Sequence, residues 1–179
     1  MTIANLALLK PLDILAYRPQ LSKDLIGRFI ATMSRGKYAH IAIYIGNGLI
    51  IESHIDSGVA RKPLNPKWYP VVDVYRYKHR LETYQKDSMS IWLESQIGKP
   101  YDLLAFPSTF IRSVVAKVFH ADEFRKDKPI FNSNKAFYCS ELGASMFNYI
   151  GIKINRKVNS MSTTPSDMVA DRGQVKRIC

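Results

Sequence analysis

One cysteine, Cys139, stands where the sequence predicts the first turn of a helix, in the segment Phe137-Tyr138-Cys139-Ser140-Glu141-Leu142. A thiol at a helix N-terminus lies near the positive end of the helix dipole, which favours the thiolate form. The unpaired amides there can also hold an oxyanion. This placement predicts nucleophilic attack on a carbonyl carbon, although a single cysteine also fits a small buried apolar residue.

A nucleophilic cysteine needs a base, and His40 is the best placed of the four histidines, His40, His54, His79 and His120. It lies in a β-rich run in which residues 40, 42 and 44 share one strand face. The apolar stripe Ile41, Ile43 and Ile45 occupies the other face. The imidazole of His40 can therefore face a cleft, although a structural histidine in a strand would show the same pattern.

The segment Gly46-Asn47-Gly48 predicts a hairpin turn between the runs 38–45 and 49–54, because glycine and asparagine tolerate positive φ. A three-residue loop would set the pairs Ile45–Leu49, Ala42–Glu52 and His40–His54. Glu52 would then lie diagonal to His40, with roughly 7–8 Å between their Cβ atoms. A two-residue loop would place Glu52 on the opposite face. A Cys139-His40-Glu52 triad therefore depends on register, and spacing alone leaves His54 as an equal candidate for the third position.

The elements that must position these residues change in type along the chain. We expect strands at 13–18, 38–45, 49–54 and 70–77, and helices at 21–33, 81–97, 110–118 and 139–150. Segments 55–69 and 120–135 are expected to be loops. Strands followed by helices predict an α+β domain with a mainly antiparallel sheet.

Composition is that of a single folded domain. The 179 residues are 46% hydrophobic and 23% charged, which excludes disordered and low-complexity classes. The net charge of +11 predicts attraction to an anionic surface, such as cell wall, acidic lipid or nucleic acid. No helix-turn-helix, zinc-finger or RNA-binding aromatic motif favours nucleic acid among these.

Sequence signals for other chemistries and other compartments are missing. Two cysteines give no disulfide framework, and no zinc-ligand spacing, phosphate loop or dinucleotide fingerprint occurs, so we expect no cofactor and no metal. The N-terminus lacks a basic region and a cleavage site, and no apolar stretch is long enough to span a bilayer. These features predict a protein that is not transmembrane and is cytoplasmic, or else exported by a route that the N-terminus does not encode.

Six segments together resemble the circularly permuted papain-like amidases, the YiiX/YaeF-like branch of the NlpC superfamily. They are 11–15, 38–46, 51–53, 98–102, 137–142 and 164–167. The match runs in order from about residue 11 to 170, with histidine before cysteine, the reverse of papain. The resemblance implies one permuted papain-like domain over 1–179, with a sheet or barrel packed against helices. The 36 residues between Asp102 and Cys139 depart from the short link of unpermuted relatives, so we expect an insertion at about 103–135.

The resemblance also implies roles for single residues. It makes Cys139 the nucleophile, His40 the base and Glu52 the polar residue twelve positions after the histidine. Tyr101 matches a tyrosine whose hydroxyl helps to form the oxyanion hole with the amide of Cys139, although by itself it also fits a core or rim tyrosine after a helix end. The implied protein is a thiol hydrolase or acyltransferase acting on an amide, peptide or isopeptide, or on a lipid acyl bond.

A second reading is a non-catalytic binding module for an anionic partner. Basic residues cluster at Lys117, Arg125, Lys126 and Lys128, and again at Arg172, Lys176 and Arg177. The apolar face of 110–118 would suit a lipid-facing element, but ordinary core packing explains it better. Substitution of Cys139 by alanine separates the two readings, because only an enzyme would lose turnover.

Overall fold

The structure, a computed structural model, describes residues 7–19, 31–32, 36–65, 71–103 and 135–179. The expected helix at 110–118 and nearly all of the helix at 21–33 lie outside these residues, as do most of the basic segment 120–135 and most of the insertion at 103–135. Within the described residues, no helix is both long enough and apolar enough to cross a membrane.

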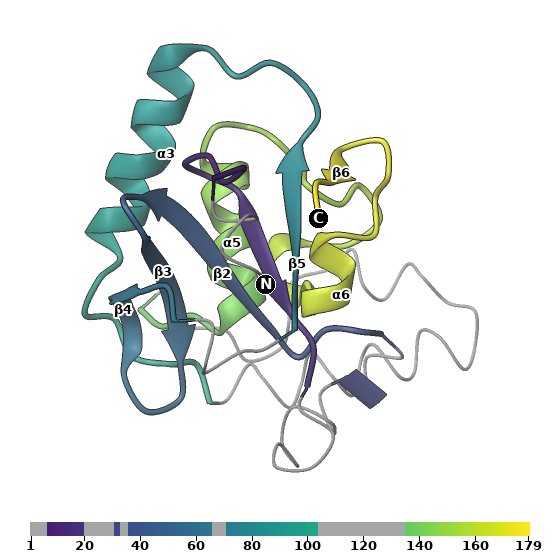
Figure 1. Cartoon of the computed structure of the whole chain (residues 1–179). Coiled ribbons are helices and arrows are strands. Elements are labelled where there is room, and N and C mark those ends of the chain that lie inside the picture. The colour runs from purple at the N-terminus through teal and green to yellow at the C-terminus, as the bar shows by residue number, and fades with distance from the viewer. Residues whose placement is uncertain (1–6, 20–30, 33–35, 66–70, 104–134) are drawn as a thin grey trace.

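A six-stranded antiparallel sheet forms the body of the described fold (Figure 1). Its strands are β1 (Ile14–Tyr17), β2 (His40–Gly46), β3 (Leu49–His54), β4 (Gly58–Pro63), β5 (Val72–Tyr77) and β6 (Val175–Arg177). Their order is β4-β3-β2-β1-β5-β6. Together with the helices, this sheet confirms the predicted α+β class.

Helix α5 (Cys139–Tyr149) is the central helix of the other layer. It packs against β2, β3, α3 (Thr83–Ser95), the short helix α6 (Pro165–Met168) and the 3-10 turn η2 (Ser160–Ser162). The shared core joins sheet residues with α5 residues, among them Ile41, Ile43, Ile51, Leu142, Met146 and Phe147. Because the first six residues of α5 are all buried, its first residue, Cys139, is held in a fixed position against the sheet.

The hairpin between β2 and β3 has the predicted Glu52 register but reaches it by a different route. Gly46, not Ile45, pairs with Leu49, so the hairpin has the shorter of the two loops that the sequence left open. A two-residue turn, Asn47-Gly48, has φ values of 52° and 70°. A bulge between Tyr44 and Gly46 then shifts the ladder by one residue, and Ala42 pairs with Glu52 as expected.

Two edge strands and a short helix were not predicted from sequence. β4 occupies part of the expected loop 55–69. β6 is the last element in the chain, after the helices, and pairs with β5. Pro63 ends β4, which is compatible with its position because proline is tolerated on edge strands. The expected strands and the helices at 81–97 and 139–150 are present, with ends that move by at most two residues.

Candidate active site

Cys139 is anchored through the residues on either side of it. It is the first residue of α5 and is 5% exposed. The hydroxyl of Ser53 on β3 donates to the carbonyl of Phe137 at 2.5 Å, and the hydroxyl of Ser140 donates to the carbonyl of Thr163 at 2.6 Å. These buried hydrogen bonds attach the start of the helix to the sheet and to the segment before α6. The thiol is therefore held at the helix N-terminus, as the sequence predicted.

His40, at the start of β2, contacts Glu52 directly. Its Nε2 lies 2.7 Å from Oε2 of Glu52, and the side chain of Glu52 is 2% exposed. The ring of His40 also stacks on Tyr17, with 5.7 Å between centroids. The structure therefore brings together the predicted base and the carboxylate, across the hairpin register that the sequence required.

His54, the alternative third residue, has a different relation to His40. The two imidazole rings lie edge to face with 6.0 Å between centroids, and Nδ1 of His54 lies 3.3 Å from Oδ2 of Asp56. Burial lowers the pKa of His54, and the nearby charge of His40 acts in the same direction. Glu52, rather than His54, is thus the residue that forms a hydrogen bond with the imidazole of His40.

His40 also forms a hydrogen bond with Cys139, and charge links all three residues. Burial opposes protonation of His40, but the negative charges of Glu52 and Cys139 and hydrogen bonds to both raise its pKa to about 10. Burial likewise opposes ionisation of Glu52, but His40 and Lys62 lower its pKa to about 2. Because Nε2 faces Glu52, Nδ1 is the ring nitrogen left for the thiol. The charged imidazolium of His40 beside the carboxylate of Glu52 is therefore the favoured state of this pair.

Tyr101 is positioned beside Cys139 by backbone pairing. It forms a parallel bridge with Phe137, and the amide of Asp102 donates to the carbonyl of Phe137 at 3.2 Å. Burial raises the pKa of Tyr101, and the charge of Cys139 raises it further, so the phenol stays protonated and can donate a hydrogen bond. Tyr101 thus lies beside Phe137, two residues before Cys139 in the chain, so the structure places the fourth predicted site residue near the cysteine.

Lys62 is the main site residue that sequence reasoning missed. Its Nζ lies 3.0 Å from Oε1 of Glu52. The register of β3 with β4 pairs Ile50 with Lys62 and Glu52 with Ala60, so Lys62 is a diagonal neighbour of Glu52. No local signal could have found it, because β4 itself was not predicted. Tyr17 was missed as well, although its strand was predicted.

A metal site requires several His, Cys, Asp or Glu side chains close together. Among the described residues, no group of three or more such side chains is arranged to hold a metal ion. The site as built is a thiol, an imidazole, a carboxylate and a phenol.

Comparison with known proteins supports the fold. No protein-family model and no curated protein matches the sequence. Among solved structures, the chain is similar to the crystal structure of the metalloprotein YiiX from Escherichia coli O157:H7. The TM-score is 0.61 with 17% sequence identity, over 95% of this chain and 96% of that chain. The protein therefore has a YiiX-like fold.

Proposed function

We propose that this protein is a cysteine-dependent acyl hydrolase or acyltransferase. The observation that carries the proposal is His40, which contacts Glu52 on one side and Cys139 on the other. An imidazole base held between a nucleophile and a carboxylate that orients it is the arrangement that activates thiols for attack on carbonyl groups. The YiiX-like fold is compatible with this chemistry but does not by itself imply it.

The proposed first half-reaction forms a thioester. The thiolate of Cys139 attacks the carbonyl carbon of an amide or ester, and the carbonyl π electrons move to oxygen. The amide of Cys139 and the hydroxyl of Tyr101 are the donors for that oxyanion. When the intermediate collapses, the bond to the amine or alcohol breaks, and the imidazolium of His40 gives its proton to the leaving group.

The second half-reaction returns the thiolate. His40, now neutral, removes a proton from water or another acceptor as that acceptor attacks the thioester carbon. The carbon–sulfur bond breaks, the acyl product leaves, and Cys139 is again a thiolate beside an imidazolium. Glu52 keeps the imidazole oriented and favours its charged form, while Lys62 holds Glu52 from the other oxygen.

The proposed substrates are compounds with an acyl group on nitrogen or oxygen: a peptide or isopeptide amide, or a lipid ester or amide. These classes share the carbonyl that the thiolate attacks and differ in the leaving group that His40 must protonate. A panel of acyl esters and amides, with short and long acyl chains, therefore separates them.

Trapping of an acyl-enzyme tests the proposal. The full chain is mixed with activated acyl esters and with peptide amides, quenched in acid and digested for mass spectrometry. We expect acylation on Cys139 that hydroxylamine removes, as it removes thioesters, and none on that position in Cys139→Ala. Acylation confined to Cys179, or spread over lysines, would refute the proposal and leave a binding module as the alternative.

A further inference from the structure

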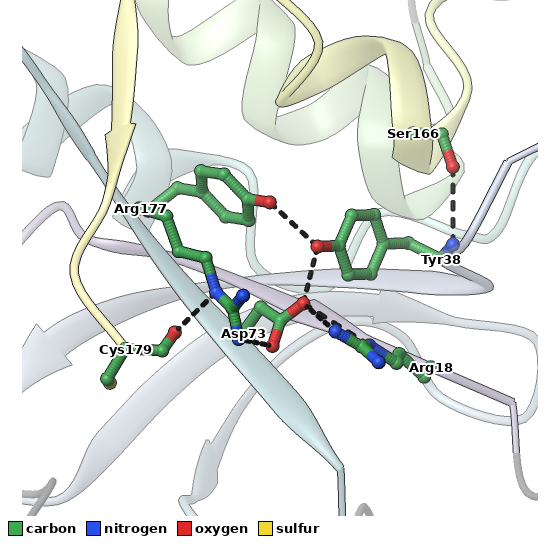
Figure 2. Close-up of polar contacts among 7 residues, drawn as sticks. Arg18, Tyr38, Asp73, Ser166, Arg177 and Cys179 are labelled. Atoms are coloured by element: carbon green, nitrogen blue, oxygen red, sulfur yellow. Dashed lines mark hydrogen bonds and ion pairs between the residues drawn. The ribbon is translucent and has the colours of Figure 1, made fainter. Parts of the chain in front are cut away.

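A second group of charged residues lines a cavity of about 280 Å³ around Asp73. The lining comes from strands β5 and β6, from α6 and from the segments beside β1 and β2. Figure 2 shows Arg18 and Arg177 on either side of the Asp73 carboxylate, with Tyr38 above it. Four basic side chains and one carboxylate line the cavity: Arg18, Lys37, Arg172, Arg177 and Asp73.

Asp73 fixes the direction of two guanidinium groups. Nη2 of Arg18 lies 2.7 Å from Oδ2, and Nη2 of Arg177 lies 2.7 Å from Oδ1. The hydroxyl of Tyr38 donates to Oδ2 at 2.5 Å. Burial would raise the pKa of Asp73, but the hydrogen bonds from Tyr38 and Arg18 lower it, so the carboxylate stays charged. Both arginines are thus oriented before any ligand arrives.

Each of these arginines keeps donors for a ligand. Arg18 uses Nε and Nη2 on Asp73, while Arg177 uses Nη2 on Asp73 and Nε on the carbonyl of Cys179. Within the described residues, Nη1 of each arginine makes no hydrogen bond. A guanidinium carries five N–H donors, so this network does not exhaust either side chain. The side chains of Arg18 and Arg177 are 39% and 50% exposed, so a solute can reach them.

A purely structural role accounts for only part of the group. The ion pairs of Arg18 and Arg177 with Asp73 join the ends of β1, β5 and β6, which stabilises the sheet. They do not explain why Lys37 lines the same cavity, nor why Arg172 does, whose guanidinium lies over the ring of Tyr75 rather than beside a carboxylate. Neither of these two forms an ion pair in the described part of the chain, so the cavity holds a surplus of positive charge.

We propose that this cavity binds a phosphate group, either of a soluble phosphate ester or of an acidic lipid head group. Guanidinium groups match phosphate oxygens in paired hydrogen bonds, and a doubly charged group offsets the surplus of positive charge. The hydroxyl of Ser166 accepts from the amide of Tyr38 and keeps its own proton to donate. The cavity volume of about 280 Å³ lies below the roughly 300–1,000 Å³ of pockets for drug-sized ligands, so it suits a small group such as phosphate. The proposal does not depend on the reaction at Cys139.

Titration of the full chain with inorganic phosphate at low ionic strength tests the site. Binding is measured by calorimetry, and the residues affected are identified by amide NMR. We expect saturable binding, with the largest shifts at residues 36–38 and 170–173. The variant Lys37→Gln/Arg172→Gln should bind about tenfold more weakly or worse, since a lost hydrogen bond to a charged group is worth that much. The matched control Lys157→Gln/Lys176→Gln removes the same charge at exposed positions outside the cavity and should bind as the parent does.

Equal binding by both double variants, or shifts spread evenly over the basic surface, would overturn the proposal. Absence of saturable binding would overturn it too, and neither result would touch acylation of Cys139. A second arm uses phosphatidylcholine vesicles with and without phosphatidic acid. If vesicle binding needs phosphatidic acid, Lys37 and Arg172, the ligand is a lipid head group. If only inorganic phosphate shows this dependence, the ligand is a soluble phosphate ester.

Discussion

Replacement of Glu52 by glutamine should lower the pKa of His40 and destabilise the fold in a pH-dependent way. The change keeps the shape of the side chain and removes the charge that lies 2.7 Å from Nε2 of His40. Burial then acts on His40 with only Cys139 to oppose it. Because Glu52 is nearly fully buried, solvent cannot replace the lost charge.

The size of the effect follows from the pair itself. An opposite charge at this distance shifts a pKa by roughly 1–3 units, so His40 should titrate between about 7 and 9 in the variant, down from about 10. Leaving the partners of Glu52 without their charge should cost about 1–3 kcal/mol of unfolding free energy. Replacement of Glu94, whose ion pair with Arg61 is exposed, should cost less than about 1 kcal/mol.

The two titrations set the pH window of this stabilisation. The pKa of His40 is raised from 6.5, so its contribution is complete below about 6.5 and is lost as the pH rises toward about 10. The pKa of Glu52 is lowered from 4.5, so its contribution is complete above 4.5 and is lost as the pH falls toward about 2. The difference between parent and Glu52→Gln should therefore be largest between pH 4.5 and 6.5.

Two measurements check this prediction. NMR titration of the His40 ring, assigned by its absence in His40→Asn, gives the pKa in parent and variant. Urea denaturation at pH 5.5 and at pH 9 gives the stability of parent, Glu52→Gln and Glu94→Gln. The reasoning would be refuted by a His40 signal that titrates alike in parent and Glu52→Gln. A Glu52→Gln cost that matches Glu94→Gln at both pH values would refute it as well.

Three further predictions concern the parts around this pair. Tyr101→Phe should lower kcat by about a hundredfold with KM little changed, because it removes one oxyanion donor; an unchanged kcat on an acyl substrate would remove Tyr101 from the site. Gly58→Ala should cost about 2–4 kcal/mol in thermal or urea unfolding. This glycine has φ +60° and a Cβ there would meet the backbone of Lys99 and Pro100, whereas Gly48→Ala, with φ +70° and open space, should cost roughly half as much; equal costs would contradict the packing argument. Lys62→Met should raise the pKa of Glu52 and move the acid limb of any pH–rate profile upward, and an unmoved limb would show that Lys62 does not act on Glu52.

Local patterns could predict the parts of the site that lie on strongly marked elements. Cys139 was expected at a helix start, and one of the two hairpin registers left open placed Glu52 opposite Ala42, because β-rich runs around a glycine-asparagine turn restrict the possible pairings. The bulge at Ile45 was not visible in the sequence. A two-residue turn followed by a bulge gives the same pairing of Ala42 with Glu52 as a three-residue loop would, so the sequence could not distinguish them. Proximity of His40 to Cys139 was a hypothesis about distant segments, and the packing of α5 on β2 brings them together.

Other parts depend on contacts that no local pattern encodes. The segment Gly58–Pro63 holds glycine, proline and two charged residues, so it becomes a strand through pairing with β3 rather than by its own propensity. Lys62 therefore reaches Glu52 only through tertiary structure. The cavity around Asp73 is likewise built from Arg18, Tyr38 and Arg177, which are far apart in the chain and meet only when β1, β2, β5 and β6 assemble.

The central claim, that Cys139 is a nucleophile activated by His40, is tested most directly by the pH dependence of its alkylation. Iodoacetamide labelling would be followed by mass spectrometry at each cysteine, with the partly exposed Cys179 as internal reference and His40→Ala as comparison. We expect Cys139 to be alkylated faster than Cys179 at pH values below about 8.5, where a free thiol is mostly protonated, and to lose this advantage in His40→Ala. A Cys139 that reacts no faster than Cys179 there, or that reacts identically without His40, would contradict the account.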